Sequence, residues 1–318
     1  MKINLKSTCK AFLILASATA LFSFTNSTES NYREKMIPPG TIKIGANFFA
    51  DQKELCNLDW KEYVFWTGRI FGKESEEYES VLPKTKVWNI PDLACLNEEF
   101  RNHYMNHSAY QRYPVIGISQ EQAVKYLEWR SDRVFEMILI NNKVIEQNFA
   151  QSAGDYFSIK NYFAGRYKNM EPDTVNFAYY PEYTLPSPEE FQELVDHNEF
   201  LVNEKKLKLS VKTDARYLKT QIGVRACNGR DYIQRPTRPV DIDWISDKEQ
   251  LYNLDGNVSE WLNNGQVAGG SWRNNPADKH AIYRNNGASA FIGIRAVCKW
   301  KRYDPKANYD EEEEDDDY

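Results

Sequence analysis

Cysteine is the first residue type in this sequence that could carry chemistry, and its spacing restricts what that chemistry can be. Four cysteines follow the first twenty residues: Cys56, Cys95, Cys227 and Cys298. None is close enough to another to form a CxxC redox motif or a zinc-binding pair. In an oxidising compartment, four cysteines can form two disulfides in three alternative pairings. We favour Cys56 with Cys95 and Cys227 with Cys298, and buried thiols are the alternative.

Histidine is the second candidate for metal chemistry. The chain has four, at positions 103, 107, 197 and 280. His103 and His107 are four residues apart, so a helix would place both on one face. The segment around them is polar, and no carboxylate stands at a spacing that would complete an iron-binding triad. We therefore expect structural or surface roles for the histidines.

The N-terminus predicts export. Three lysines precede an apolar run over residues 11–20, and Ala18-Thr19-Ala20 is typical of a signal-peptide cleavage site. We expect a signal peptide over 1–20 and a polar leader over 21–35. A membrane anchor is the weaker alternative because the apolar run ends by Phe24, and Cys9 precedes that run, so no lipid anchor is expected. No other segment could cross a bilayer. The expected location is the periplasm, the outer membrane or the medium.

Charge is concentrated at the two ends of the chain. The net charge of -6 includes three lysines of the signal peptide and eight carboxylates over residues 310–317. Without these, residues 21–309 are close to neutral, which excludes the basic surface of a nucleic-acid-binding protein. The final EEEEDDDY predicts a solvated, disordered acidic tail over 303–318.

Two helix starts and one strand have clear local signals. Ser119 and Gln122 have the spacing of a capping box, and Ser187 precedes Pro188 in the same way that an N-cap precedes the first helical residue. Residues 41–45 alternate like a half-buried strand, and residues 54–66 have the apolar spacing of a short amphipathic helix. In the first capped helix, the residues that recur at helical spacing are Ala123, Tyr126, Leu127, Arg130, Val134 and Met137. In the second, the expected buried face is Phe191, Leu194 and Val195.

Several segments, in order, resemble the formylglycine-generating-enzyme (sulfatase-modifying-factor) family. They are MIPPGTIKIGA, ELCNLDWKEYVFW, YPVIGISQEQAVKYLEWRSDRV, YTLPSPEEFQELV, RPVDIDW, LYNLDGNVSEW, VAGGSW and FIGIRAV, spread over residues 36–298. The resemblance implies one α+β domain over 36–302, related to C-type lectins, with long ordered loops and little regular secondary structure. The form HSAYQRYPVIG…EWRSDRV is most similar to the gliding-motility and type IX secretion lipoproteins of Bacteroidetes.

Enzymes of this family oxidise a substrate cysteine with two cysteines of their own, which bind copper shortly after the GGS block. Here Gly269-Gly270-Ser271 is followed by WRNNPADKHAIYRNNGAS, in which Asn274 and Lys279 stand near the positions of those thiols. Neither an amide nor an ammonium can replace a thiolate as a Cu(I) ligand. We therefore expect neither copper nor the oxidase reaction. A related branch uses iron, which the histidines do not support.

The resemblance also implies a calcium site in LYNLDGNVSEW. The matching positions are the side chains of Asn253 and Glu260 and the backbone carbonyls of Gly256 and Val258, all hard oxygen donors. The alternative is an Asn/Gly turn in which Glu260 pairs with an arginine. Arg295, in the GIR segment, is expected to be a buried residue that holds loop carbonyls or Glu260.

These observations favour a non-catalytic scaffold or binding protein of the cell envelope, a pseudoenzyme with a protein or glycan partner. A role in gliding motility or type IX secretion is the finer hypothesis. Two alternatives stay open: an enzyme with altered chemistry on the same fold, with a polar pocket below Ser271 and Trp272, and a secreted glycan-binding module.

Overall fold

The computed structural model describes residues 36–91, 97–204, 224–225, 232–233, 237, 239–240, 250–272 and 281–304. The predicted signal peptide and leader, and the predicted tail from residue 305 on, lie outside these ranges. Within them, no helix is both long and apolar enough to cross a membrane.

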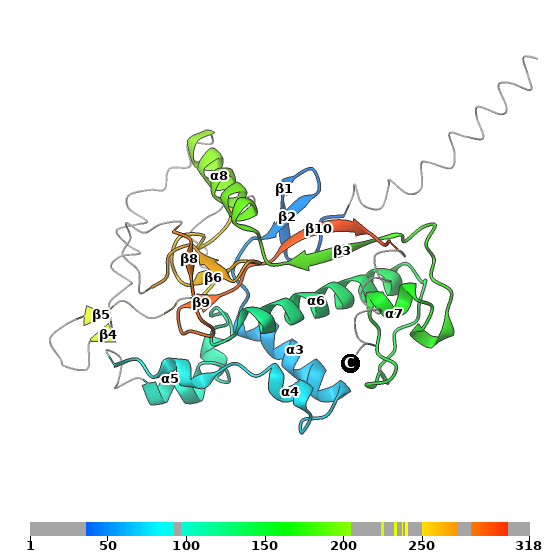
Figure 1. Ribbon diagram of the computed structural model, residues 1–318, viewed down its shortest axis with the longest axis horizontal. Coiled ribbons are helices and arrows are strands. Elements are labelled where there is room, and N and C mark those ends of the chain that lie inside the picture. Colours follow the sequence, from blue (N-terminus) through cyan, green and yellow to red (C-terminus); the bar gives the residue numbers. More distant parts are fainter. Residues whose placement is uncertain are drawn as a thin grey trace, which may run out of the picture.

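A four-stranded antiparallel sheet forms the centre of the described structure (Figure 1). Its strand order is β1(Thr41–Gly45), β2(Phe48–Asp51), β10(Val297–Arg302) and β3(Tyr179–Thr184). The first two strands form a hairpin, and β10 inserts between this hairpin and β3, with Cys298 opposite both Phe49 and Tyr183. The end of the domain is therefore hydrogen-bonded to its beginning.

A smaller sheet holds the loops near residue 260. Its order is β8(Tyr283–Arg284), β7(Gln266–Ala268), β6(Ser259–Trp261) and β9(Ile292–Gly293), and β6 and β9 are parallel. A separate pair joins β4(Val224–Arg225) to β5(Tyr232–Ile233). The strands of both are only two or three residues long, so side-chain contacts as well as ladder hydrogen bonds must hold the loops between them.

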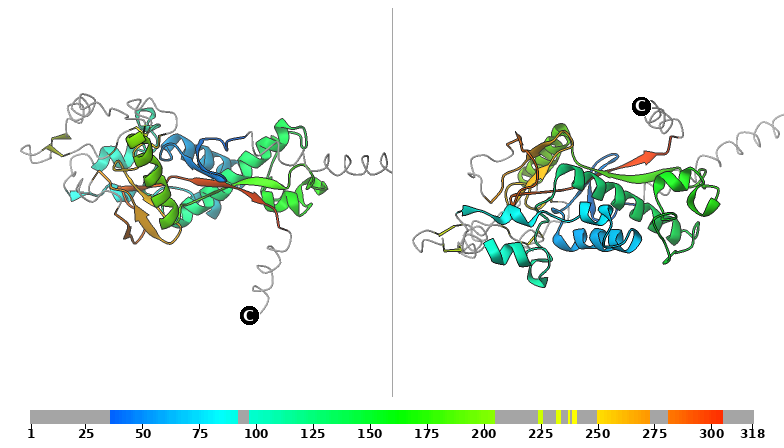
Figure 2. Two further views of the ribbon diagram at one scale, coloured as in Figure 1. Left: turned by 90° about the horizontal axis from the view of Figure 1, so that it is seen from above. Right: turned by 60° about the horizontal axis from the view of Figure 1, so that its bottom comes forward.

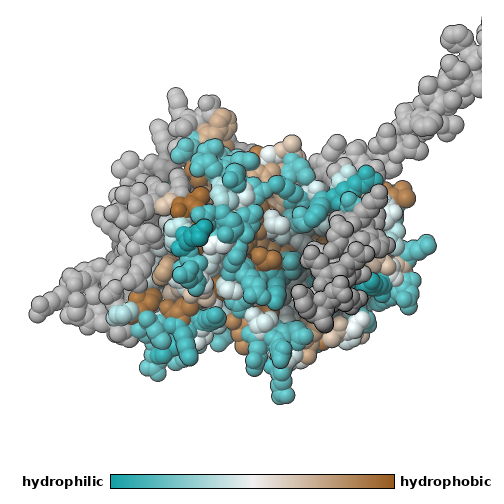
Figure 3. Space-filling model, viewed as in Figure 1, coloured by the Kyte–Doolittle hydropathy of each residue, from teal (hydrophilic) through white to brown (hydrophobic). Residues whose placement is uncertain are grey.

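Helices cover one side of the central sheet. The helix α6(Gln120–Asn141) lies along it, and α3(Asn57–Ile70) lies on the far side of α6 (Figures 1 and 2). The helix α8(Pro188–Glu204) stands near β1. The shorter helices are α4(Glu76–Ser80), η1(Thr85–Trp88), α5(Asn97–His103), η3(Ser108–Tyr110), α7(Ile159–Phe163) and η4(Tyr167–Asn169). The face shown in Figure 3 is largely hydrophilic, with apolar residues in separate small areas.

The two predicted helix caps are confirmed. Ser119 and Gln122 form a reciprocal capping box at the start of α6, and the Ser187 hydroxyl accepts a hydrogen bond from the Glu190 N–H. The expected face of α8 is buried. On α6, however, Met137 is 43% exposed, so the predicted apolar face extends further than the elements that cover it. The helix predicted over 54–66 begins three residues later, because the Asp59 carboxylate accepts the Cys56 N–H and starts it there.

The core is divided into aromatic clusters. The largest lies between the sheet, α6 and α3, and includes Trp60 stacked on Tyr126 with ring centroids 5.2 Å apart. The C-terminal half of α6 builds another with the segment that contains α7. Tyr303 stacks on Phe163 at 4.1 Å, so the packed domain continues one residue past the predicted boundary at 302.

Candidate functional site

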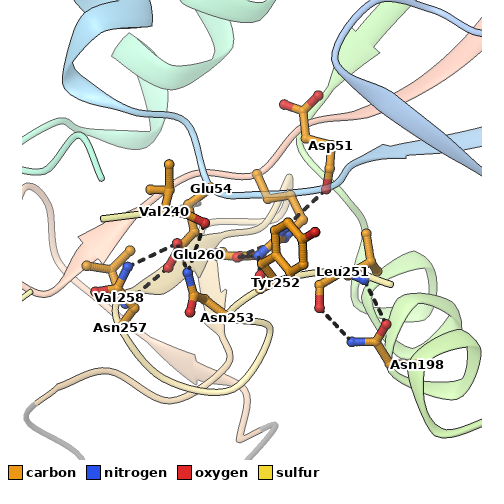
Figure 4. A network of polar contacts seen from close by, with 11 residues as sticks. Asp51, Glu54, Asn198, Val240, Leu251, Tyr252, Asn253, Asn257, Val258 and Glu260 are labelled. Atoms are coloured by element: carbon orange, nitrogen blue, oxygen red, sulfur yellow. Dashed lines mark hydrogen bonds and ion pairs between the residues drawn. The ribbon is translucent and has the colours of Figure 1, made fainter. Parts of the chain in front are cut away.

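The loop over residues 250–258, which leads into β6, has a backbone that only a few residue types adopt easily. Asn253, Gly256 and Asn257 have φ angles of 53°, 98° and 57°. Asparagine and glycine tolerate this left-handed region better than other residues. The loop is anchored at its start, where the Asn198 amide of α8 both donates to the Leu251 carbonyl and accepts from the Leu251 N–H. Hydrogen bonds from the side chain of a residue outside the loop therefore help to hold its unusual backbone (Figure 4).

Glu54 occupies the inside of this loop. It precedes α3 in the chain and has no exposed surface. Its Oε2 accepts hydrogen bonds from the side-chain amides of Asn253, at 2.9 Å, and Asn257, at 3.0 Å. The Val258 N–H lies 3.4 Å from Oε1. A carboxylate from one end of the domain is therefore bound by a loop that is about 200 residues away in sequence (Figure 4).

Sequence reasoning missed Glu54. The segment ELCNLDW was used to predict an amphipathic helix, and a glutamate at the start of such a helix is ordinarily in water. No local spacing distinguishes a glutamate that caps a helix from one that enters a distant loop. Only the resemblance of the segment to the family could have drawn attention to it.

Arg295 confirms the role predicted for it. Its Nε donates to both Glu260 oxygens, at 2.9 and 3.1 Å, and its Nη2 lies 2.7 Å from Glu260 Oε1. Its remaining hydrogen bonds go to the backbone carbonyls of Asp51, at 3.0 Å, and Tyr252, at 2.7 Å. The guanidinium and the carboxylate are 0% and 1% exposed. Arg295 thus ties together β2, β6 and the loop.

The site contains more buried negative charge than positive charge. Glu54 and Glu260 share one guanidinium, that of Arg295. Burial raises the pKa of Glu54 to about 7; the Glu260 charge acts in the same direction, and Arg295 opposes both. Burial also raises the pKa of Glu260, and Arg295 again opposes it. A buried carboxylate in this situation must either hold a proton or be neutralised by a cation.

The predicted calcium ligands fall into two groups. Asn253, Gly256 and Val258 lie in the loop around Glu54, whereas Glu260 is directed at Arg295. Among the described residues, no three His, Cys, Asp or Glu side chains gather at one point. A cation here would therefore depend on amide and carbonyl oxygens in addition to carboxylates. In the structure the groups that face Glu54 are the N–H donors of Asn253, Asn257 and Val258. A hard cation such as calcium would therefore require the Asn253 amide to turn its oxygen, in place of its nitrogen, towards the ion.

The segment around the GGS block is close-packed where the structure describes it. A Cβ on Gly269, which has a φ of 73°, would lie 2.8 Å from the Leu254 carbonyl oxygen. Ser271 is buried, and the Trp272 N–H donates to the Asn257 carbonyl at 2.9 Å. The half-buried Trp272 ring donates from Nε1 to the Ala290 carbonyl. Asn274 and Lys279, near the family's thiol positions, lie outside the described residues.

The two described cysteines are buried free thiols. Cys56 is the N-cap of α3, and burial raises the pKa of its thiol to about 11. Cys298 lies in β10 with no exposed surface, and burial raises the pKa of its thiol further. Both are therefore poor nucleophiles. Cys95 and Cys227, their expected partners, lie outside the described residues, so the two pairings stay predictions.

The structure describes three of the four histidines. His103 and His107 are exposed, with ring centroids 6.1 Å apart, and His107 Nδ1 accepts the Ala109 N–H. His197 lies on α8, and His280 is outside the described residues. Trp261 is a core ring whose Nε1 donates to the Ile118 carbonyl.

A family model described as the sulfatase-modifying factor enzyme 1-like domain matches residues 7–300. No curated protein matches the chain in sequence. Among solved structures, "Crystal Structure of CarF" is similar with a TM-score of 0.34 and 15% identity, covering 81% of this chain and 87% of that one. "Treponema denticola variable protein 1" is similar with a TM-score of 0.33 and 13% identity, covering 79% and 84%.

Proposed function

Since the chain belongs to the family of sulfatase-modifying factor enzyme 1-like domains, we propose that it is a non-catalytic member that serves as a scaffold or binding protein of the bacterial envelope. Its loops would bind a protein partner there. The gliding-motility or type IX secretion machinery is the setting that the segment HSAYQRYPVIG…EWRSDRV favours.

One observation carries the proposal. The stretch from Trp272 to Phe291, which follows the GGS block, has no cysteine. Cys298, the next cysteine along the chain, has no exposed surface and no neighbouring described thiol. Thiol oxidation needs an accessible thiolate. Neither described cysteine meets this requirement.

The polar network supports a binding role because it holds the loop through side chains of distant parts of the chain. Glu54 lies before α3, Asn198 belongs to α8 and Arg295 lies before β10, and each is hydrogen-bonded to the loop. A loop that is already ordered loses little conformational entropy when a partner binds. Rigid presentation of this surface is therefore what the network provides.

We propose that calcium belongs to the same loop, with Glu54, Asn253, Gly256 and Val258 as the residues that would hold it. When bound, the ion would supply a second positive charge beside that of Arg295, so that each of the two buried carboxylates would have a partner. The protein's own contribution is to order the loop around Glu54 and to keep Glu260 paired with Arg295. This role is structural, and it involves no step of catalysis.

Cross-linking in intact cells tests the envelope role. A tagged full-length chain would be expressed at its native level, cross-linked and purified from the envelope fraction. We expect the same envelope proteins in repeated purifications, and none with a control that lacks residues 1–20 and is not exported. Recovery of the exported chain only as a free monomer would contradict the proposal.

A second experiment addresses the alternatives. The purified protein would be incubated with copper and a cysteine-containing peptide, and the peptide would be analysed for formylglycine by mass spectrometry. We expect no conversion. Conversion of the peptide would show that the family's oxidase reaction is retained and would contradict the proposal. Copper or iron bound stoichiometrically without conversion would favour an enzyme with altered chemistry. Specific hits on a glycan array, without a protein partner in the cross-linking experiment, would favour the glycan-binding module.

A further inference from the structure

The helix α3 has a row of exposed side chains along its outer side. Leu58, Glu62, Phe65 and Arg69 are four, three and four residues apart, which places them on one face of a helix. Phe65 is 72% exposed and Leu58 is 42% exposed, whereas Trp60 and Tyr63 of the same helix are buried in the largest core cluster. We call these four residues the outer row of α3.

Two contacts orient the charges around the outer row. Lys61, on its flank, donates to the Asn106 carbonyl at 3.2 Å and is thereby held by its own chain. Arg69 donates to the Phe149 carbonyl at 3.3 Å. The Phe149 side chain is itself 77% exposed, so it extends the apolar surface beyond the end of the row.

We propose that the outer row of α3 binds the outer row of a second copy of this chain, with the two helices antiparallel and Phe65 at the two-fold axis. The proposal does not depend on the envelope role or on calcium. Two-fold contacts require a surface that is complementary to itself. The spacing of the outer row has this property, as the positions along the helix show.

The charges match across such an axis. With a rise of about 1.5 Å per residue, Glu62 lies about 4.5 Å before Phe65 and Arg69 lies about 6 Å after it. In the antiparallel pair, the positions of Glu62 in one copy and Arg69 in the other would therefore differ by about 1.5 Å along the helix axes. Two reciprocal ion pairs would form, one on each side of the contact between the Phe65 rings.

The apolar ends match as well. Leu58 lies seven residues before Phe65, and Gly72 lies seven residues after it. Gly72 follows Phe71, the C-cap of α3, has a φ of 96°, and has open space where a side chain would stand. Leu58 of one copy can therefore enter the space beside Gly72 of the other. Because the row contains few residues, we expect a weak dimer with a dissociation constant of about 10–100 µM.

Sedimentation equilibrium of the purified chain tests the proposal. The protein concentration would range from about one tenth of the expected dissociation constant to about ten times that constant. We expect wild type to shift from monomer to dimer. Phe65→Glu should remain monomeric because it buries two like charges at the axis. The matched control is Phe200→Glu, which changes another exposed phenylalanine, 61% exposed, on α8 and should dimerise like wild type. A monomeric wild type, or equal loss in both variants, would overturn the proposal.

Charge reversal separates self-association through this row from any other kind. Glu62→Arg and Arg69→Glu should each weaken the dimer about threefold to tenfold, because each places like charges opposite one another. The double variant should recover wild-type affinity to within about twofold, since the reciprocal pairs are restored with opposite polarity. Circular dichroism and thermal melting would establish that each variant folds. A double variant weaker than both single variants would refute the antiparallel arrangement.

Discussion

Arg295 and Glu260 form an ion pair that is shut off from water, with Arg295 Nη2 2.7 Å from Glu260 Oε1 and both side chains at most 1% exposed. The pair joins the strand β6 to the segment before β10, and Arg295 also holds the carbonyls of Asp51 and Tyr252. Charges this deeply buried are costly unless each has a partner. The loop at Glu54 and the central sheet therefore depend on the same guanidinium.

Removal of Arg295 should be severely destabilising. Arg295→Met would leave Glu260 and Glu54 buried without a counter-charge, and we expect a loss of about 3–5 kcal/mol in the free energy of unfolding, measured by chemical denaturation. The control is Lys301→Met. The Lys301 side chain is paired with Glu182 at 2.6 Å but is 54% exposed, so its loss should lower the free energy of unfolding by less than about 1 kcal/mol. Similar losses in both variants would contradict a special role for the buried pair.

Calcium should stabilise the protein through Glu54. At a concentration about 100 times the dissociation constant, a ligand that binds only the folded state adds about 2.7 kcal/mol of stability, which corresponds to a rise of roughly 5–10 °C in Tm for a domain of this size. We expect this rise in wild type on adding calcium after chelation. Glu54→Gln, which keeps the shape of the side chain but removes its charge, should abolish it. Glu182→Gln is the control and should respond like wild type.

Two outcomes of the calcium experiment would contradict the prediction. A wild type that melts at one temperature with calcium and with chelator would remove calcium from the loop. A Glu54→Gln variant that keeps the full rise in Tm would place the ion elsewhere.

The buried thiols should be unreactive in the folded protein. Burial raises the pKa of Cys56 to about 11 and that of Cys298 further, so almost no thiolate is present at neutral pH. We expect both thiols of the reduced protein at pH 7.5 to be alkylated at least about 100-fold more slowly in the folded state than after denaturation. Peptide mass spectrometry would measure the extent of alkylation at each cysteine. Rapid alkylation of Cys298 in the folded state would show that this thiol is accessible and would contradict the prediction.

The same mapping without reduction tests the disulfide predictions. Protein collected after export should yield linked peptides for Cys56 with Cys95 and Cys227 with Cys298. Linked peptides in another pairing would contradict these predictions.

Asp132 should make stability depend on pH. It lies on α6, accepts the Ile159 N–H at the start of α7, and burial raises its pKa to about 7, opposed by that hydrogen bond and by Arg133. A carboxyl whose pKa is raised by folding stabilises the folded state at low pH, and this contribution is lost as the pH rises through about 7. Asp132→Asn, which keeps the acceptor but cannot ionise, should therefore be more stable than wild type at pH 8, by about 1–2 kcal/mol, and equal to it at low pH. An equal advantage at both pH values would show that Asp132 does not titrate.

The parts of the fold that depend on neighbouring residues could be predicted from the sequence. The caps at Ser119 and Ser187 are confirmed because the cap and its partner are three residues apart and need no other element. The buried face of α8 is confirmed for the same reason, since apolar spacing determines which side chains share a face. Periodicity does not say how far a covering element extends, and Met137 is exposed although it shares the apolar face of α6.

The candidate site was predicted only in part. The resemblance placed the calcium expectation on one stretch of chain, and within that stretch it indicated the loop that the structure shows. The pairing of Glu260 with Arg295 was among the predictions and is confirmed, and Glu260 as a calcium ligand stays a prediction. What the sequence did not indicate is that Glu54, 199 residues before Asn253, enters the loop, because this depends on how β2, β6 and β10 are placed together. Spacing along the chain determines local hydrogen bonds, but the balance of buried charge is decided only when distant segments share one interior.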